Sequence, residues 1–185
     1  MPIEKNRLLY HLTSLENIES ILRNGLLSRR DNFHKFDDVA ESDIIKFRKK
    51  VGLDLYVPFH FFPKNPFDGR VQIDSPKKTF IYICVSKEFA RNKNFKVVTK
   101  HPTALKHLSL YRYLPGIKKI DWHTMNIRDY SDDNCRHVCM AECLSPNLIK
   151  LQDFECVYAP NNRAAHHVKE KCLDEFDRLL FPIEV

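Results

Sequence analysis

The chain has 185 residues, a length that predicts one compact domain spanning residues 1–185, since single domains commonly hold about 100–200 residues. Its 43% hydrophobic content can fill a core and excludes general disorder, while 30 Lys and Arg against 24 Asp and Glu mildly favour an anionic partner. The 4 glycines stand far apart and exclude both a Walker phosphate loop and a GxGxxG dinucleotide turn.

The N-terminal segment predicts a strand followed by a helix. Residues 7–12, RLLYHL, are apolar enough for a short strand, and Thr13 or Ser14 can cap the helix after it. The apolar residues of LENIESILRNGLL, at 15–27, keep helical spacing, and Gly25 supplies a left-handed stop. The chain therefore opens with a strand, a helix and a glycine.

The next segment is charged and then becomes abruptly aromatic. Residues 28–50 carry both charges and predict a mobile surface loop with a helix over SDIIKFRKK, at 42–50. Three prolines in YVPFHFFPKNPF, at 56–67, argue against a regular central strand. We expect a bulged edge strand or an ordered loop there.

The second half of the chain mixes strands and helices without the regular alternation of a parallel fold. The pattern predicts strands over 79–86 and 95–101 with a short charged helix between them, a helix from 120, a polar break over 129–134, an apolar segment over 135–146 and a closing helix over 172–182. No repeat or linker divides the chain, so we expect a mixed α+β domain.

The cysteines give no recognisable metal motif. Cys135, Cys139 and Cys143 would share one helix face if the helix continued that far, but zinc sites use tighter spacing. A buried apolar stripe is favoured over a metal site, and we predict no bound metal. The chain shows no signal peptide and no apolar run near the ~18 residues of a membrane span, so we expect a cytoplasmic protein with reduced thiols and no membrane partner.

Glu142 is the carboxylate that stands out. It lies in the apolar frame CMAECL, where an ionised side chain should not occur unless it faces a cleft. Transfer chemistry at a nucleotide sugar develops positive charge on the sugar and needs a carboxylate beside it, together with cations for the diphosphate. A structural glutamate in a salt bridge is the plain alternative.

Other candidates carry a plain alternative as well. His11 and His101 sit at predicted strand ends, where each can hydrogen-bond a ligand or simply be a satisfied core histidine. Arg48 belongs to the cationic run KFRKK, which is typical of a solvated helix face and also compatible with a specific site. Basic residues interleaved with aromatics over 47–67 suit a single-stranded nucleic acid groove, and equally a core strand beside a basic loop.

Taken in order, these segments resemble the DarT family of bacterial toxins, ADP-ribosyltransferases that use NAD+ to modify bases of single-stranded DNA. The resemblance is carried by YHLTSLENIESILRNGLLS, YVPFHFFPKNPF, VVTKHPTAL, IDWHTM and HVCMAECLSP, which together cover most of residues 7–160. It implies an α+β ADP-ribosyltransferase fold with two small, mostly antiparallel sheets flanking an NAD-binding cleft. Such a fold holds NAD+ without a glycine-rich turn.

The resemblance also assigns roles to residues of this sequence. It makes Glu142 and Arg48 catalytic, with Arg29 and Arg30 as rival arginines, and NAD+ a co-substrate in place of any permanently bound cofactor. The residues implied to contact NAD+ are Tyr10, His11, Thr13, Arg48 and His101. The residues expected to contact nucleic acid are Lys46, Lys49, Lys50, Lys64, Tyr130 and Arg136.

The expected activity is transfer of ADP-ribose from NAD+ to a base of single-stranded DNA, thymine being favoured, with release of nicotinamide. RNA or another base is the alternative acceptor, and a non-catalytic single-strand-binding module is the rival from another class. The resemblance further suggests a macrodomain antitoxin, DarG-like, as partner. His60 replaces an aromatic of the family string, and the polar segment over 128–137 is particular to this chain, which leaves the target base open.

Overall fold

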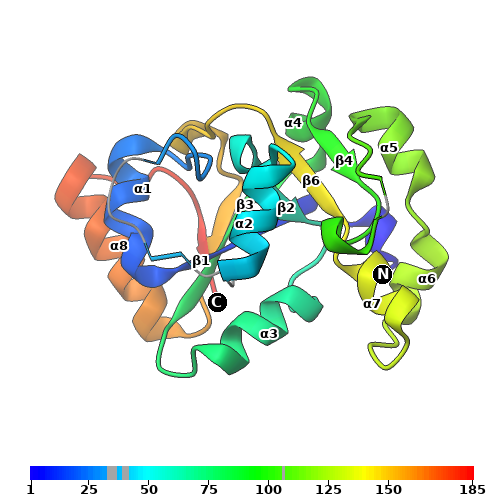
Figure 1. Cartoon of the computed structure of the whole chain (residues 1–185). Coiled ribbons are helices and arrows are strands. Elements are labelled where there is room, and N and C mark those ends of the chain that lie inside the picture. Colours follow the sequence, from blue (N-terminus) through cyan, green and yellow to red (C-terminus); the bar gives the residue numbers. More distant parts are fainter. Residues whose placement is uncertain (33–36, 39–41, 106) are drawn as a thin grey trace.

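The sheet determines the architecture of this protein, seen in a computed structural model that describes residues 1–32, 37–38, 42–105 and 107–185. Its eight strands run in the order β5-β4-β6-β2-β1-β3-β7-β8, antiparallel except for the β7–β8 pair (Figure 1). The strands are β1 Leu8–Ser14, β2 Val57–His60, β3 Phe80–Ser86, β4 Lys96–Val98, β5 Tyr111–Arg112, β6 Glu142–Ser145, β7 Cys156–Tyr158 and β8 Ile183–Glu184.

The prediction of two sheets is wrong, because the two halves are joined at their inner strands. β1 and β2 pair at one position, Tyr10 opposite His60, whereas β1 pairs with β3 along its whole length, from Leu8 to Ser14. Four strands, β5-β4-β6-β2, therefore lie on one side of this junction and four, β1-β3-β7-β8, on the other. The mixed α+β class is confirmed.

The prediction of an edge strand at YVPF is also wrong, because β2 lies inside the sheet between β1 and β6. It pairs with β6 from Val57 to His60, and the proline ring is accommodated because β1 does not pair with β2 at Pro58. The Pro58 carbonyl instead lies 2.7 Å from Nδ1 of His11. A side chain thus replaces a ladder hydrogen bond at the junction.

Helices cover both ends of the sheet. They are α1 Ile18–Asn24, α2 Ser42–Lys50, α3 Pro66–Asp74, α4 Lys87–Asn92, α5 Tyr113–Lys119, α6 Trp122–Ile127, α7 Asp133–Cys139 and α8 Asn162–Phe176, with 3-10 turns at Ile3–Lys5, Leu15–Asn17, Leu53–Leu55, Pro102–Ala104 and Leu151–Asp153. α1 and α8 lie together at one end, and α2 crosses the front of the sheet (Figure 1). The predicted surface loop before α2 falls partly outside the described residues.

Local signals set several helix boundaries where the sequence predicts them. Gly25 ends α1 with φ of 75°, and the carboxylate of Asp121 accepts from the backbone N–H of Thr124 at the start of α6. The helix predicted for the cysteine stripe stops early, because α7 ends at Cys139 and Cys143 lies in β6. The three cysteines therefore do not share one helix face.

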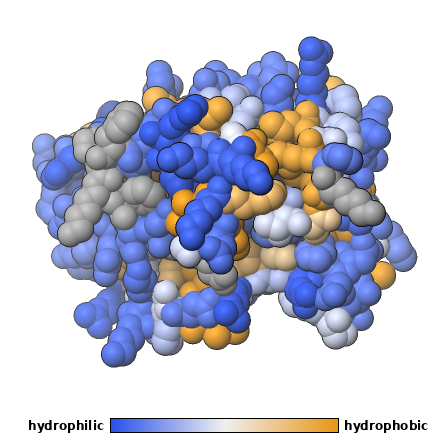
Figure 2. Space-filling view, in the orientation of Figure 1, coloured by the Kyte–Doolittle hydropathy of each residue, from blue (hydrophilic) through white to orange (hydrophobic). Residues whose placement is uncertain are grey.

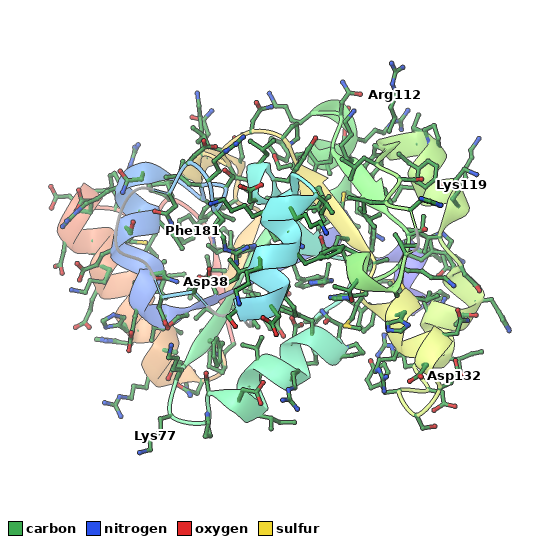
Figure 3. The ribbon with its side chains drawn as sticks, in the orientation of Figure 1. Asp38, Lys77, Arg112, Lys119, Asp132 and Phe181 are labelled. Atoms are coloured by element: carbon green, nitrogen blue, oxygen red, sulfur yellow. The ribbon has the colours of Figure 1, made fainter. Side chains whose placement is uncertain are left out.

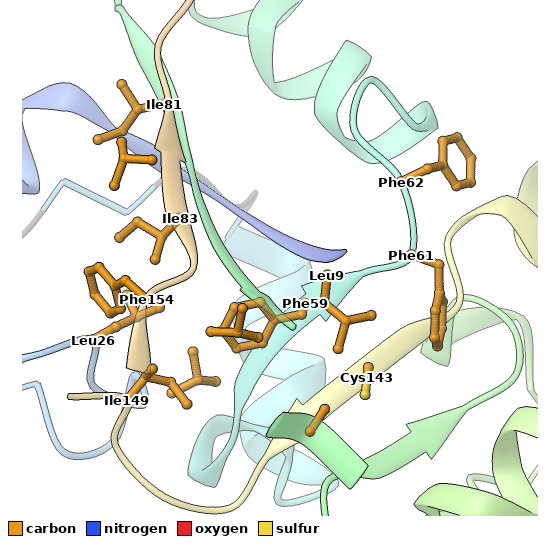
Figure 4. Packing of buried hydrophobic residues seen from close by; sticks show 14 of the residues in the cluster. Leu9, Leu26, Phe59, Phe61, Phe62, Ile81, Ile83, Cys143, Ile149 and Phe154 are labelled. Carbon is orange, nitrogen blue, oxygen red and sulfur yellow. The ribbon is translucent and has the colours of Figure 1, made fainter. Parts of the chain in front are cut away.

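The core runs continuously beneath both halves of the sheet. Ile81 and Ile83 of β3 pack on one side and Cys143 of β6 on the other, with Phe59 of β2 between them (Figure 4). Phe59 is fully buried, so the junction between β1 and β2 is also part of the core. Within the part of the chain that the structure describes, no helix has the length and apolar character to cross a membrane.

Candidate active site

A buried ion pair lies where α2 crosses the sheet. Nη1 of Arg48 donates to both carboxylate oxygens of Glu142, at 2.8 and 2.9 Å, and only 7% and 5% of the two side chains are exposed. Nη2 of Arg48 is buried without a hydrogen-bond partner among the described residues. A buried guanidinium donor left without an acceptor indicates a place for an anionic ligand.

Glu142 reaches this position because the end of α7 feeds directly into β6. Glu142 pairs across the sheet with His60 of β2 and with Val98 of β4, so it belongs to an interior strand. Burial raises the pKa of Glu142, but the Arg48 guanidinium and the nearby His60 and His101 more than offset it, and the pKa lies below its ordinary value. The carboxylate is therefore ionised at neutral pH.

His11 faces the junction from the other strand. The Pro58 carbonyl can only accept a hydrogen bond, so its 2.7 Å contact assigns the proton of His11 to Nδ1 and leaves Nε2 as an acceptor. Burial lowers the pKa of His11 to about 4, so the ring is neutral at pH 7. Nε2 can accept a hydrogen bond from a ligand amide or hydroxyl.

A small cavity of about 90 Å³ opens beside His11. Its lining includes Thr13 of β1 and Arg29, and it lies next to Tyr56 at the start of β2. Arg29 binds Asp38 through two hydrogen bonds, of 2.6 and 2.7 Å, and is thus held in place. The polar walls and the neutral imidazole suit a polar ligand rather than a hydrocarbon.

The three candidate arginines occupy different places. Arg48 is the one that contacts Glu142, whereas Arg29 contacts Asp38 beside the cavity. Nε of Arg30 lies 4.0 Å from Asp54, and its side chain is 60% exposed. The geometry thus favours Arg48 as the partner of the carboxylate and keeps Arg29 near the ligand cavity.

Two more histidines surround Glu142. His101 follows β4, and its Nδ1 lies 2.6 Å from the hydroxyl of Thr103. Burial lowers the pKa of His101 to about 4, although Glu142 acts in the opposite direction. His60 stacks on Phe67 with ring centroids 5.5 Å apart, and its Nδ1 lies 3.2 Å from the Ala141 carbonyl.

The sequence did not reveal a second buried carboxylate, Asp68, next to His60. Oδ2 of Asp68 accepts from the Tyr82 hydroxyl and from the amide of Asn65, both at 2.9 Å, while Oδ1 is buried without a hydrogen-bond partner among the described residues. Burial raises the pKa of Asp68. The available signal was the capping pattern NPFD, which places Asn65 and Asp68 at the start of α3.

The residues expected to contact nucleic acid lie on three separate segments. Lys46, Lys49 and Lys50 are exposed on α2, and Lys64 is exposed after β2. The other two, Tyr130 and Arg136, lie between α6 and α7 and in α7; Tyr130 is 36% exposed, and Arg136 forms an ion pair with Asp133 of its own helix.

These segments surround an indentation but do not form one continuous basic surface. In the space-filling view the lower edge is indented between α3 and α7 (Figure 2). Asp132, at the start of α7, marks the lower right of the molecule (Figure 3).

The described residues contain no group of three or more His, Cys, Asp or Glu side chains that could hold a metal ion, and the six cysteines are buried and free.

Comparison with known proteins decides the family. The sequence profile described as "ssDNA thymidine ADP-ribosyltransferase, DarT" matches residues 10–185. The chain belongs to the DarT family. The resemblance noted in the sequence is thereby confirmed.

Two curated proteins are similar to this DarT chain. A DNA ADP-ribosyl transferase of Thermus sp. (strain 2.9) is 24% identical over 139 residues, which cover 67% of this chain and 66% of that protein. A DNA ADP-ribosyl transferase–DNA ADP-ribosyl glycohydrolase fusion protein of Thermosipho africanus is 24% identical over 181 residues, which cover 89% of this chain. The chain spans 45% of the length of that fusion protein.

Solved DarT structures share the fold. The Thermus sp. 2.9 DarT in complex with ADP-ribosylated ssDNA superposes with a TM-score of 0.81 at 22% identity, covering 97% of this chain and 93% of that one. The same protein in complex with NAD+ gives a TM-score of 0.75 at 20% identity, covering 97% and 96%.

Proposed function

We propose that this chain is an NAD+-dependent ADP-ribosyltransferase that modifies a base of single-stranded DNA, thymine being favoured, and releases nicotinamide. The observation that carries the proposal is the buried pair of Arg48 on α2 and Glu142 on β6, next to the junction of β1 and β2. Membership of the DarT family supports this chemistry, and the Thermus relative, whose structures hold NAD+ and ADP-ribosylated ssDNA, supports the choice of both substrates.

NAD+ is proposed to enter as a substrate on the side of β1 that carries His11 and Thr13. Nε2 of neutral His11 accepts a hydrogen bond from the nicotinamide end, and Thr13 lines the same cavity. Nη2 of Arg48, which has no hydrogen-bond partner within the described part of the chain, is a donor for the diphosphate. Tyr10, an expected NAD+ contact, does not line that cavity, and its ring lies in a different groove.

Glu142 acts on the reacting sugar. As the bond from the ribose to nicotinamide breaks, positive charge develops at the anomeric carbon, and an ionised carboxylate in a water-poor site stabilises it. Nicotinamide leaves as a neutral molecule, and a ring nitrogen of the acceptor base forms the new bond to the same carbon. The proton of that nitrogen passes to Glu142 or to a neighbouring base such as neutral His101.

The acceptor must be unpaired, because a base stacked in a duplex cannot reach a buried carboxylate without being flipped out. We propose single-stranded DNA as the acceptor for that reason, with RNA or another base as the alternative. We further propose that the protein works in the cytoplasm as a single domain and is opposed by a macrodomain antitoxin. The fusion of transferase and glycohydrolase in the Thermosipho relative supports such a pairing.

The test is to incubate the protein with NAD+ and short DNA or RNA oligonucleotides that differ in one unpaired base, and to weigh the products. An added ADP-ribose on thymine-containing DNA alone supports the proposal. An adduct on RNA or on another base would show that thymine in DNA is not the acceptor. If nicotinamide is not released with any acceptor, the rival interpretation as a non-catalytic single-strand-binding module holds.

A further inference from the structure

An open groove of about 780 Å³ lies on the face of β1 opposite to His11 and Thr13. Side chains alternate along a strand, so Tyr10 and Leu12 point into the groove while His11 and Thr13 face the small cavity. Its walls come from β1, β3 and β7, from the turn after β2, and from the loop between α3 and β3. The mechanism proposed for NAD+ makes no use of this space.

Three tyrosines form the floor of the groove. Tyr82 and Tyr158 are cross-strand partners on β3 and β7, and both stay half-buried. Tyr10 contacts each of them, with ring centroids 6.0 Å apart at 86° and 6.4 Å apart at 35°. Rings held in an open groove offer flat apolar surface on which unpaired bases can stack.

Two lysines contribute to the lining of the groove. Lys64 and Lys78 line it, and no Asp or Glu side chain is among the described residues of its lining. Lys78 forms an ion pair with Asp37, whereas Lys64 is exposed at the rim. Lys77, next to Lys78, marks the loop at the lower left of the molecule (Figure 3). Uncharged donors and acceptors, Gln72 and Asn161 among them, complete a lining suited to phosphates and base edges.

The turn at Lys64 is held in an uncommon conformation. Its φ of 58° is left-handed, which β-carbon sterics disfavour for any residue other than glycine. The backbone N–H of Lys64 donates to the Tyr82 hydroxyl at 3.0 Å, and that hydroxyl donates to Asp68. The backbone of Lys64 is thus held at the rim of the tyrosine floor, and strained backbone of this kind gathers at binding sites.

Tyr10, in the floor of the groove, lies two strands away from Glu142. Glu142, His60 and Tyr10 are successive cross-strand partners on β6, β2 and β1. Neighbouring strands are ~4.8 Å apart, so the backbone of Tyr10 lies roughly 10 Å from that of Glu142. A polymer whose target base reaches Glu142 can lay its neighbouring nucleotides over the tyrosines.

We infer that this groove binds the nucleotides flanking the modified base of a single-stranded nucleic acid, an inference that rests on the proposed function for the identity of that polymer. Stacking on Tyr82 and Tyr158 supplies sequence-tolerant affinity, and Lys64 contacts a phosphate. The groove therefore sets how long a strand the protein engages, whereas the site at Glu142 sets which base it modifies.

The test measures transfer to oligonucleotides with one target base and a length of about four to about sixteen nucleotides, the range of single-strand site sizes. For wild type we expect KM for the oligonucleotide to fall as the strand lengthens. Tyr158→Ala should raise KM for the long strands by about tenfold, as loss of one stacking ring does, and so flatten this dependence. Lys64→Ala should reduce the salt slope of binding by about 0.7.

Matched controls lie at the far end of the sheet. Tyr111→Ala removes a half-buried tyrosine of β5, and Lys118→Ala removes an exposed lysine of α5. Both should keep the wild-type length dependence and salt slope. If Tyr158→Ala also keeps the wild-type length dependence while its thermal stability is unchanged, the groove does not hold the strand and the inference is overturned.

A second measurement separates this inference from the proposed function. Binding of a fluorescent oligothymidylate without NAD+ needs no chemistry, and we expect Tyr158→Ala and Lys64→Ala to weaken it relative to both controls. That result supports the inference that the groove binds the strand, even if no oligonucleotide is ever modified. Equal binding by all variants overturns that inference, even if wild type modifies DNA.

Discussion

The contact between α2 and β6 and the surface of α7 both hold charged side chains, but only the contact between α2 and β6 buries them. Arg48 and Glu142 are 7% and 5% exposed, whereas Arg136 and Asp133 of α7 are 43% and 77% exposed. An exposed pair contributes little to stability, and a buried pair must overcome the loss of hydration of both charges. An arginine–carboxylate pair therefore indicates function where it is buried between α2 and β6, and solubility where it is exposed on α7.

Within α2 the contrast recurs between neighbouring residues. Lys46, Lys49 and Lys50 are exposed, and Arg48 is the cation of the run that turns inward to Glu142. A guanidinium can bind a carboxylate through Nη1 while Nη2 stays available, which an ammonium cannot match in geometry. Removing Arg48 should consequently have effects that removing its neighbours does not.

The largest expected effect on stability is that of Arg48→Ala. It leaves Glu142 buried without its counter-charge, which costs about 3–5 kcal/mol of unfolding free energy. In wild type the lowered pKa of Glu142 means that its stabilisation is present at neutral pH and is lost as pH falls. In the variant the main influence that lowers this pKa is gone while burial still raises it, so the stability difference between variant and wild type should shrink as pH falls.

Urea denaturation of Arg48→Ala at several pH values measures both effects. Lys46→Ala is the matched control, since it removes an exposed cation of the same helix whose ion pair with Asp43 is exposed too. We expect a change within about 0.5 kcal/mol for the control. An equally small loss for Arg48→Ala would mean that the buried carboxylate of Glu142 does not depend on Arg48 as its counter-charge.

Acid should destabilise the protein through His11 and His101. Burial lowers both pKa values from 6.5 to about 4, so between these values the unfolded chain binds a proton that the native histidine does not. Stability is then present above pH 6.5 and falls with decreasing pH, by about 1.4 kcal/mol per pH unit for each histidine. His11→Gln should remove one such contribution, whereas His123→Gln, at an exposed position, should remove none. If the stability of both variants changes equally with pH, then the lowered pKa of His11 does not contribute to acid destabilisation.

A smaller and more selective effect is expected at the acceptor side. Tyr130 and Arg136 lie ahead of Glu142 in sequence and can stack on a base or read its edge. Replacing both with Ala should lower transfer to oligonucleotides or change the modified base, while NAD+ binding by calorimetry stays within a few-fold. If transfer is untouched, recognition of the acceptor lies elsewhere, along residues 56–67.

The smallest effects belong to single lysines. If Lys46, Lys49, Lys50 and Lys64 each contact a phosphate, every Lys→Ala change should reduce the salt slope of single-strand binding by about 0.7. Fluorescence anisotropy at several salt concentrations measures this. If the affinity of wild type for the single strand does not change with salt concentration, then nucleic acid is not the partner.

Local signals made most elements of this fold predictable. The start of α6 near residue 120, the stop at Gly25 and the helix over 42–50 all lie where the sequence indicates. Pairing across the sheet was not predictable, since the prolines over 56–67 argue for an edge and the interior position depends on β6 and on the His11 contact with Pro58. A local pattern cannot specify a partner 47 residues away.

The candidate site also has one part that the sequence predicts and one part that only tertiary structure shows. Glu142 was identifiable because an ionised carboxylate is uncommon among apolar residues, and its apolar neighbours are adjacent in the sequence CMAECL. The contact between Arg48 and Glu142 spans 94 residues, and the grouping of Tyr10, Tyr82 and Tyr158 depends on strand register. Those features arise from tertiary packing, which spacing along the chain does not show.

The most direct test of the central claim is the amount of ADP-ribose that Glu142→Gln transfers to a thymine-containing single strand, measured by mass spectrometry beside wild type. Gln keeps the shape and the NAD+ site, and transfer should fall by a factor of ~10² or more. Glu155→Gln, at an exposed glutamate before β7, is the control and should match wild type. Transfer by Glu142→Gln at the wild-type rate would contradict the account.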